Sequence, residues 1–255
     1  MADGQVYSRL MATYRRRGGG FLLLLDPDRA GENPCIALAE AAEECGVDAL
    51  LVGSSFTLNT NFASAVKQIK AVTPLPVIIF PGSFAQVTPD ADAILFTSLI
   101  SGRNPNYLID EQVRGAPLVK RFGLEVIPTG YMLIESGRQT SVQYISGTQP
   151  IPSAKHDIAC AHALAAQYLG MKLVYLEAGS GADSPVPIRM VHAVADYVDI
   201  PLLIGGGLTS PEECAARIDA GASFVVVGNI LEDDPRFTYL TELTAATHPL
   251  ETVAV

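Results

Sequence analysis

The sequence predicts an α/β fold: a closed (β/α)8 barrel of the TIM type, as a single domain over residues 1–255. Three observations predict it. Eight short apolar runs with little charge recur along the chain, as expected of parallel strands that are covered on both faces. Helical patterns, with apolar residues three and four apart, separate most of these runs. The chain of 255 residues has about the length of such a barrel, and no linker or low-complexity segment divides it. An open doubly wound sheet is the alternative.

Each strand is predicted from an apolar run, and each helix from a periodic one. The expected strands are Phe21–Leu25, Ala49–Val52, Val77–Phe80, Ala93–Phe96, Glu125–Ile127, Leu173–Leu176, Leu202–Ile204 and Phe224–Val227. The expected helices are Cys35–Cys45, Phe62–Ala71, Tyr107–Phe122, Ile158–Leu169, Ile188–Val198 and Pro211–Ala220.

Several helix ends carry clear signals. Gly46, Gly170 and Gly221 follow helical patterns, where glycine commonly ends a helix. Ser210 before Pro211 predicts a helix start, since serine caps the first turn and proline fits the first helical position.

Two stretches depart from a regular barrel. The segment between Phe80 and Ala93 is too short and too rich in Pro and Gly for a full crossover helix. The segment from Gly130 to Lys155 is a long insertion after strand five. Its alternating pattern around Ser136–Gly137 predicts a small hairpin that caps one end of the sheet.

Composition excludes several function classes. The net charge of −10 argues against nucleic-acid binding, which needs clustered Lys and Arg. The one basic run, Arg15–Arg17, is interpreted as a solvated helix end before the first strand. The longest apolar run is too short to span a bilayer and the N-terminus lacks a signal-peptide pattern, so we expect no transmembrane segment and a cytoplasmic protein. Four scattered cysteines without CxxC spacing predict small core residues.

Glycines follow the last two expected strands. Gly205, Gly206 and Gly207 come after one, and Gly228 and Asn229 after the next. In such barrels the loops after strands seven and eight commonly bind phosphate, because glycines let backbone N–H groups approach an anion. Tight turns alone are the other interpretation, but two consecutive glycine-rich strand ends favour a phosphate site.

One carboxylate stands at the end of an apolar strand. Leu173–Leu176 delivers Glu177 into a loop of small residues, Ala178 to Gly181. A buried charge is costly unless something uses it, so we expect Glu177 to accept a proton from, or orient, a substrate hydroxyl. A structural ion pair on the rim is the alternative. The sequence leaves open whether Tyr175 faces the ligand or the core.

A second carboxylate follows the first strand. Asp26, in Asp-Pro-Asp, lies next to the hydroxyls of Ser54 and Ser55 after the second strand. One carboxylate can hold Mg²⁺ when waters and a substrate phosphate supply the remaining ligands. The alternative is an aspartate that caps the following helix.

The end of the fourth strand is polar and then apolar. Arg103, between Ser101 and Asn106, could meet an anion. Leu99, Ile100 and Phe84 could line an apolar groove, although ordinary packing is the favoured interpretation for them.

Taken in order, these segments resemble the geranylgeranylglyceryl phosphate synthase family, in the branch with bacterial and archaeal members. The resemblance extends from about Phe21 to Pro235 and rests on the ordered set LLDPDR, LVGSS, FTSLISGRNPNYLI, VIPTGYMLIESG, YLEAGSGA, LLIGGG and VVVGN. It implies a Mg²⁺-dependent prenyltransferase on a TIM barrel. In that reaction the 3-hydroxyl of sn-glycerol 1-phosphate attacks geranylgeranyl diphosphate, pyrophosphate leaves and an ether forms.

The resemblance also implies residue roles. Asp26 would bind Mg²⁺ with the hydroxyl of Ser55, or with that of Ser54 as the alternative, and Glu177 would be the catalytic residue. The predicted substrate-binding residues are Tyr175, Leu176, Glu177, Ala178, Gly179, Ser180, Gly181, Gly206, Gly207, Gly228 and Asn229. An apolar channel for the prenyl tail would give Leu99, Ile100 and Phe84 a purpose.

Two residues differ from those that the family often has at the same places. Arg29 stands where the family often has Lys, and Ser54 where it often has a second Gly. Related bacterial enzymes can prefer longer prenyl diphosphates. The family forms dimers and hexamers, so we expect a homo-oligomer, with Tyr131 and Tyr144 as exposed contact candidates or core residues. The competing functions are another phosphate-binding barrel enzyme and a non-catalytic barrel that binds a phosphorylated lipid.

Overall fold

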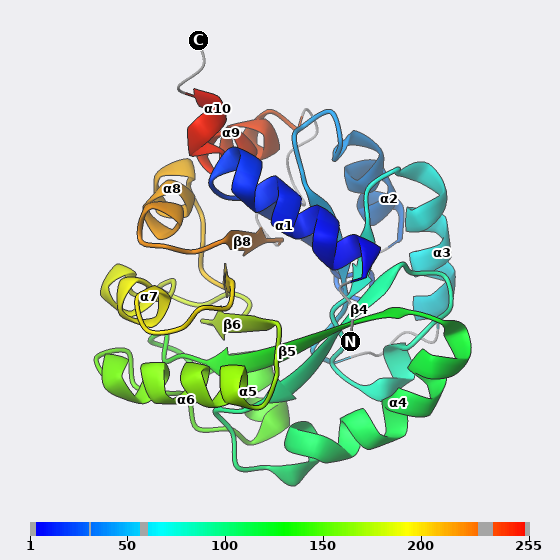
Figure 1. The fold of residues 1–255 in the computed structure, drawn as a ribbon. Coiled ribbons are helices and arrows are strands. Elements are labelled where there is room, and N and C mark those ends of the chain that lie inside the picture. The colour runs from blue at the N-terminus through cyan, green and yellow to red at the C-terminus, as the bar shows by residue number, and fades with distance from the viewer. Residues whose placement is uncertain (1–3, 31, 57–60, 229–236, 253–255) are drawn as a thin grey trace.

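Eight parallel strands close into a barrel in the computed structural model, in the order β1 to β8 (Figure 1). The structure describes residues 4–30, 32–56, 61–228 and 237–252. The strands are β1 (Phe21–Leu25), β2 (Ala49–Val52), β3 (Val77–Ile79), β4 (Ala93–Leu99), β5 (Glu125–Leu133), β6 (Leu173–Glu177), β7 (Leu202–Gly205) and β8 (Phe224–Val227). All eight expected strands are confirmed, and β8 pairs with β1 to complete the barrel instead of leaving an open sheet.

Helices surround the barrel between successive strands (Figure 1). They are α1 (Gln5–Arg17), α2 (Glu32–Ala41), α3 (Phe62–Val72), the π-helical turn η2 (Asn106–Asp110), α4 (Glu111–Phe122), α5 (Ser141–Ser146), α6 (His156–Tyr168), α7 (Ile188–Ala195), α8 (Pro211–Asp219), α9 (Thr238–Ala246) and α10 (Pro249–Thr252). In α8, Ser210 caps the first turn by accepting a hydrogen bond from the Glu213 backbone N–H, as predicted.

Strand periodicity divides the apolar residues between two layers. Because successive side chains point to opposite faces of a strand, every second residue faces the barrel axis. In β1, Leu22 packs inside the barrel, whereas Leu23 and Leu25 pack outward against the helices. The same alternation holds in β6, where Leu173 and Tyr175 face inward.

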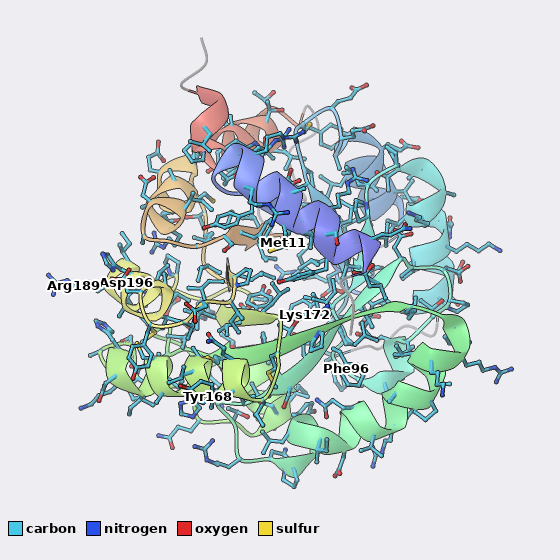
Figure 2. All side chains as sticks on the ribbon, in the orientation of Figure 1. Met11, Phe96, Tyr168, Lys172, Arg189 and Asp196 are labelled. Carbon is cyan, nitrogen blue, oxygen red and sulfur yellow. The ribbon has the colours of Figure 1, made fainter. Side chains whose placement is uncertain are left out.

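Helix α1 covers the end of the barrel at which the strands begin (Figure 1). Leu10, which is buried, packs with the interior residues, and Met11 on the same helix also contacts them (Figure 2). The Glu125 carboxylate accepts hydrogen bonds from the backbone N–H groups of Val6 and Tyr7, at 2.7 and 2.8 Å. This carboxylate at the start of β5 therefore stabilises the first turn of α1.

Of the two predictions about irregular segments, the structure confirms one and contradicts the other. The short β3–β4 connection contains only the 3₁₀ turn η1 (Phe84–Gln86), so the missing crossover helix is confirmed. The hairpin predicted around Ser136–Gly137 is wrong. The chain instead continues β5 to Leu133, makes one parallel bridge between Ile134 and Ile151, and forms the short helix α5. Pro128 and Gly130 resemble a turn in the sequence, but neighbouring strands pair with this segment on both sides.

Candidate active site

A cavity of about 230 Å³ opens where the strands end. Among the predicted site residues it is lined by Asp26, Ser54, Ser55, Tyr175, Glu177, Ser180, Gly181, Gly206, Gly207 and Gly228. Leu176 and Ala178 are buried but do not line the cavity, because their side chains pack outward in the core between barrel and helices. Asn229 lies outside the described residues.

Glu177 is the buried acid of this cavity, with a side chain on the axial face of β6. The residue is 6% exposed, and its Oε1 accepts a hydrogen bond from the Gly179 backbone N–H at 2.6 Å. Among the described residues, no Lys, Arg or His forms an ion pair with it. The structural ion pair that the sequence left open is therefore absent from the described part of the chain.

The environment of Glu177 changes its acidity. Burial raises its pKa from the usual 4.5 to about 6, because removal from water disfavours the charged carboxylate. The Tyr175 hydroxyl and the Gly179 N–H reduce this shift by stabilising the negative charge. The Tyr175 hydroxyl lies close to the carboxylate, but it makes no hydrogen bond of normal geometry with the residues that the structure describes. Both groups thus have hydrogen-bonding capacity left for a ligand.

The glycines of β7 and β8 form a wall that admits no side chain. Gly206 and Gly207 have φ values of 81° and 69°, in the left-handed region that favours glycine. A Cβ at Gly206 would collide with Glu177 Oε1, and one at Gly228 would come within 2.8 Å of the Leu24 carbonyl oxygen. The exposed backbone of this wall, directly beside Glu177, suits a phosphate group.

Asp26 lies across the mouth from Glu177, half-buried at the end of β1. Its Oδ1 accepts hydrogen bonds from the backbone N–H groups of Asp28 and Arg29, at 3.1 and 3.3 Å. Burial raises its pKa, while the Ser54 hydroxyl and these N–H groups lower it. Asp26 therefore orders its own turn, and does not cap α2, which begins at Glu32.

The two serines after β2 are placed differently. The Ser54 hydroxyl lies beside the Asp26 carboxylate and donates to the Phe56 carbonyl at 3.1 Å. Ser55 also lines the cavity, but it is exposed. The geometry therefore pairs Asp26 more directly with Ser54, the alternative, than with Ser55.

An apolar groove leads from the mouth toward the outer face of β4. Here η1 replaces a crossover helix, and the outward residues Ile94 and Phe96 pack in one cluster with Val87, just after η1, and Val119 of α4. Phe84 and Leu99 line the groove, which was the less favoured of the two interpretations of the sequence. Ile100 does not line it and packs in the outer core instead.

Three aromatic rings form the inner wall between mouth and groove. Tyr175 stacks on Phe80 with ring centres 5.2 Å apart, and Tyr131 meets Tyr175 edge-on at 5.4 Å. Tyr131 is therefore a buried site residue and not an exposed contact, whereas Tyr144 is 73% exposed. The rings present a dry surface next to the Glu177 carboxylate.

The arrangement matches a family of known proteins. A model described as the PcrB family matches residues 11–246. The chain belongs to the PcrB family. A geranylgeranylglyceryl phosphate synthase of Spirosoma linguale is 46% identical over 215 residues, which cover 84% of this chain and 86% of that protein. The protein of the same name from Thermococcus kodakarensis is 46% identical over 211 residues, covering 82% and 83%.

Solved structures share the barrel of this PcrB-family chain. The (S)-3-O-geranylgeranylglyceryl phosphate synthase of Thermoplasma acidophilum, in a crystal structure with sn-glycerol-1-phosphate, gives a TM-score of 0.90 at 35% identity. The match covers 97% of this chain and 99% of that chain.

Some site residues of this PcrB-family barrel were missed in the sequence. Phe80 ended an expected strand and Tyr131 fell in the expected insertion, but counting in twos from Ile78 and from Ile127 places both on the axial face. Gln86 is buried, and it accepts from the Gly82 N–H and donates to the Ser54 carbonyl at 2.7 and 2.9 Å. No sequence signal marks this contact. Arg103, by contrast, donates to the carbonyls of Ser101 and Gly102 and does not line the cavity.

Proposed function

We propose that this protein transfers the geranylgeranyl group of geranylgeranyl diphosphate to the 3-hydroxyl of sn-glycerol 1-phosphate and releases pyrophosphate. One observation carries the proposal: one cavity joins a glycine wall, a buried glutamate without an ion pair among the described residues, and an apolar groove. These three parts correspond to the phosphate, the reacting hydroxyl and the prenyl tail. The names of the relatives and of the structural neighbour support the same reaction.

The chemistry follows from the placement of Glu177. With the glycerol phosphate anchored at Gly206, Gly207 and Gly228, the carboxylate can accept the proton of the attacking hydroxyl. The new bond joins that oxygen to C1 of the prenyl group, and the bond from C1 to the diphosphate oxygen breaks. Pyrophosphate leaves with the electron pair. A pKa of about 6 keeps Glu177 ionised at neutral pH while leaving it basic enough to take a proton.

The proposal includes Mg²⁺, for which the donor set is suitable. Within the described ranges no three His, Cys, Asp or Glu side chains gather as a metal-binding group. A single carboxylate with a nearby hydroxyl is nevertheless a common Mg²⁺ environment when the substrate phosphates complete it. Asp26 and the hydroxyl of Ser54 or Ser55 would hold the ion. When bound, it would neutralise charge on the diphosphate leaving group.

Turnover with defined substrates tests the proposal. The protein is incubated with sn-glycerol 1-phosphate, labelled geranylgeranyl diphosphate and Mg²⁺, and the lipid is extracted and analysed. We expect labelled prenylglyceryl phosphate, and none from sn-glycerol 3-phosphate at equal concentration. Absence of product with geranylgeranyl and with longer donors would exclude the synthase and favour a barrel that only binds a phosphorylated lipid.

Two further expectations stay predictions. No described helix has the length and apolar character needed to cross a bilayer. The cytoplasmic location stays an expectation from the sequence. A dimeric or hexameric assembly is proposed from the resemblance, and light scattering on the purified protein measures the assembly directly.

A further inference from the structure

Gln86 is a buried polar residue in the short connection between β3 and β4. It is 2% exposed, and a polar group buried without hydrogen bonds is costly. Its Oε1 accepts a hydrogen bond from the Gly82 backbone N–H at 2.7 Å, and its Nε2 donates to the Ser54 carbonyl at 2.9 Å. These partners determine the orientation of the amide, because the N–H needs an acceptor and the carbonyl needs a donor. Gln86 thus joins its own connection to the loop after β2.

The turn that carries Gln86 is held by other contacts. The Gln86 backbone N–H donates to the Ser83 carbonyl at 3.1 Å, and the Ser83 hydroxyl accepts from the Ala85 N–H at 3.3 Å. The Glu111 carboxylate of α4 accepts from the Phe84 N–H at 2.7 Å, which ties η1 to the neighbouring helix. Because these contacts already order η1, we assign the Gln86 side chain to the loop after β2.

The loop after β2 leaves the sheet at Ser54. The residue before it, Gly53, still donates to the Leu25 carbonyl of β1 at 3.1 Å, in continuation of the strand pairing. The main chain at Gly82 lies directly against this loop, since a Cβ there would collide with the Ser54 carbonyl oxygen. The hydrogen bond from Gln86 therefore fixes the loop at its first residue beyond the sheet.

Ser54 carries both the carbonyl that Gln86 holds and a hydroxyl at the cavity mouth. That hydroxyl lies beside the Asp26 carboxylate and donates to the Phe56 carbonyl at 3.1 Å. A side chain is placed by its own backbone, so a fixed carbonyl restricts where the hydroxyl can lie. Donor groups that are held in place before binding lose less conformational entropy when an ion binds. The contact with Gln86 therefore prepares the Ser54 hydroxyl and Asp26 as a pair.

We infer that Gln86 is a positioning residue of the Mg²⁺ site, where it holds the Ser54 carbonyl so that the Ser54 hydroxyl stays beside Asp26. The inference rests on the proposed function, since that proposal supplies the ion. Gln86 does not line the cavity, so it acts through the loop after β2 and not on the substrate. Partners that orient metal ligands by hydrogen bonds typically change metal affinity or activity about 10–100-fold when they are removed.

Turnover measured against Mg²⁺ concentration tests the inference first. Gln86→Met keeps the length of the side chain but removes both hydrogen bonds. We expect it to raise the Mg²⁺ concentration for half-maximal turnover about ten-fold, while kcat at saturating Mg²⁺ stays within about three-fold of wild type. A lower kcat at every Mg²⁺ concentration, with an unchanged half-maximal concentration, would overturn the inference and leave Gln86 a structural residue.

Two further variants separate positioning from a simple folding defect. Thr88→Val is the matched control, because Thr88 is also 2% exposed in the same connection and its hydroxyl donates to Asp90 at 3.0 Å, away from the loop after β2. It should lower the unfolding temperature but leave the Mg²⁺ dependence unchanged. Gln86→Asn is one methylene shorter and cannot reach both partners, so it should shift the Mg²⁺ dependence in the same direction as Gln86→Met. An unchanged half-maximal Mg²⁺ concentration in the folded Gln86 variants, or an equal shift in Thr88→Val, would overturn the inference.

A double-mutant cycle tests whether Gln86 acts through Ser54. Ser54→Ala removes the hydroxyl whose position depends on the contact. In this background, Gln86→Met should change the half-maximal Mg²⁺ concentration by less than about two-fold, because the group that it positions is gone. The full effect of Gln86→Met in the Ser54→Ala background would overturn the inference, since Gln86 would then act by another route.

Binding separates this inference from the proposed function. Calorimetry with unreactive geranylgeranyl thiodiphosphate, at a series of Mg²⁺ concentrations, measures the Mg²⁺ dependence without turnover. If wild type forms no product but Gln86→Met needs about ten times more Mg²⁺ to bind the analogue, the proposed reaction fails and the role of Gln86 stands. If wild type and Gln86→Met bind the analogue with the same Mg²⁺ dependence, or without any, the role of Gln86 fails even where turnover is intact.

Discussion

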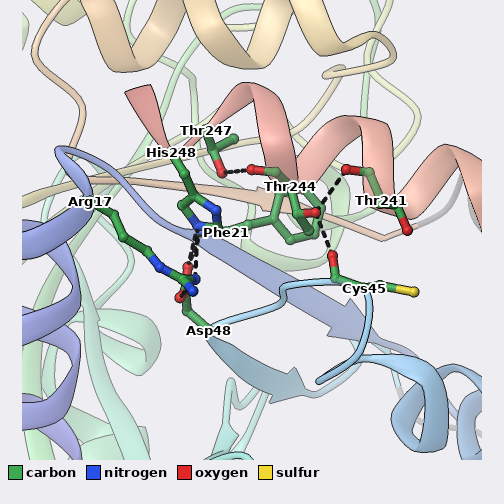
Figure 3. Close-up of polar contacts among 8 residues, drawn as sticks. All are labelled: Arg17, Phe21, Cys45, Asp48, Thr241, Thr244, Thr247 and His248. Carbon is green, nitrogen blue, oxygen red and sulfur yellow. Dashed lines mark hydrogen bonds and ion pairs between the residues drawn. The ribbon is translucent and has the colours of Figure 1, made fainter. Parts of the chain in front are cut away.

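Two buried carboxylates at opposite ends of the barrel differ in how many partners they have. Asp48, where the strands begin, accepts from Arg17 at 2.7 Å, from the Phe21 backbone N–H at 2.8 Å and pairs with His248 at 3.0 Å (Figure 3). Glu177, where the strands end, accepts one backbone N–H. Burial of a charge is costly unless it is paired, so the first arrangement stabilises the fold and the second keeps a reactive group available.

The paired end joins segments that are far apart in the sequence. Arg17 ends α1, Asp48 precedes β2 and His248 lies between α9 and α10. Beside them, the Thr244 hydroxyl donates to the Cys45 carbonyl, which ties α9 to the turn after α2 (Figure 3). The reactive end is made instead of short loops and glycines that follow separate strands.

The first test breaks the reactive end alone. Glu177→Gln keeps the shape of the side chain and its acceptor for the Gly179 N–H, but it cannot take a proton. We expect turnover to fall by about 10²–10⁴, while thermal unfolding at neutral pH stays the same or moves upward. Initial rates at saturating substrates and a calorimetric scan measure the two effects. Turnover within a few fold of wild type would leave Glu177 with a purely orienting role.

The second test breaks the paired end alone. Asp48→Ala removes the common partner of Arg17 and His248 and should cost about 3–5 kcal/mol of unfolding free energy. In a chain of this size that is roughly a 10 °C fall in Tm. Turnover per folded molecule should be unchanged at a temperature where the variant is folded. Chemical denaturation measures the unfolding free energy, and rates normalised to active sites measure turnover. A variant with wild-type stability would show that the pairing of Asp48 makes no net contribution to the unfolding free energy.

The third test concerns Asp26, which is half-buried and accepts hydrogen bonds from two backbone N–H groups, more than Glu177 and fewer than Asp48 with its ion pairs. Asp26→Asn should raise the Mg²⁺ concentration for half-maximal turnover by about 10–100-fold. Because Ser54 lies beside Asp26, Ser54→Ala should have a larger effect than Ser55→Ala, with roughly a ten-fold difference between them. Turnover measured against Mg²⁺ concentration ranks the three variants. A larger effect at Ser55 would instead make it the ligand that the family resemblance indicated.

The sequence predicts the site residues where the strands end, but not the ion pairs where the strands begin. The residues of the mouth follow strands directly, so apolar runs and glycines locate Asp26, Glu177 and Gly206 without a structure. The Asp48–His248 pair joins residues 200 positions apart, and no local pattern indicates it. The continuation of β5 through Pro128 and Gly130 was missed likewise, because pairing with β4 and β6 overrides a local turn signal. Side-chain pairs between distant segments and the full length of β5 depend on long-range contacts, so the sequence did not predict them.

The last test measures how the difference in unfolding free energy between wild type and Glu177→Gln depends on pH. Below pH 4.5, the usual pKa, Glu177 is protonated in folded and unfolded chains and burial costs nothing extra. Between pH 4.5 and about 6, Glu177 ionises in the unfolded chain but keeps its proton in the folded chain, so wild type should lose about 2 kcal/mol relative to the variant across this window and level off above it. Contributions from Asp48 and every other unaltered group cancel in the difference. Denaturant titrations from pH 4 to 8 measure it, and kcat/KM should fall below a pH of about 6, where the carboxylate of the folded chain takes up its proton. A flat difference would mean that the carboxylate is stabilised as fully as Asp48, and the contrast between the two ends would disappear.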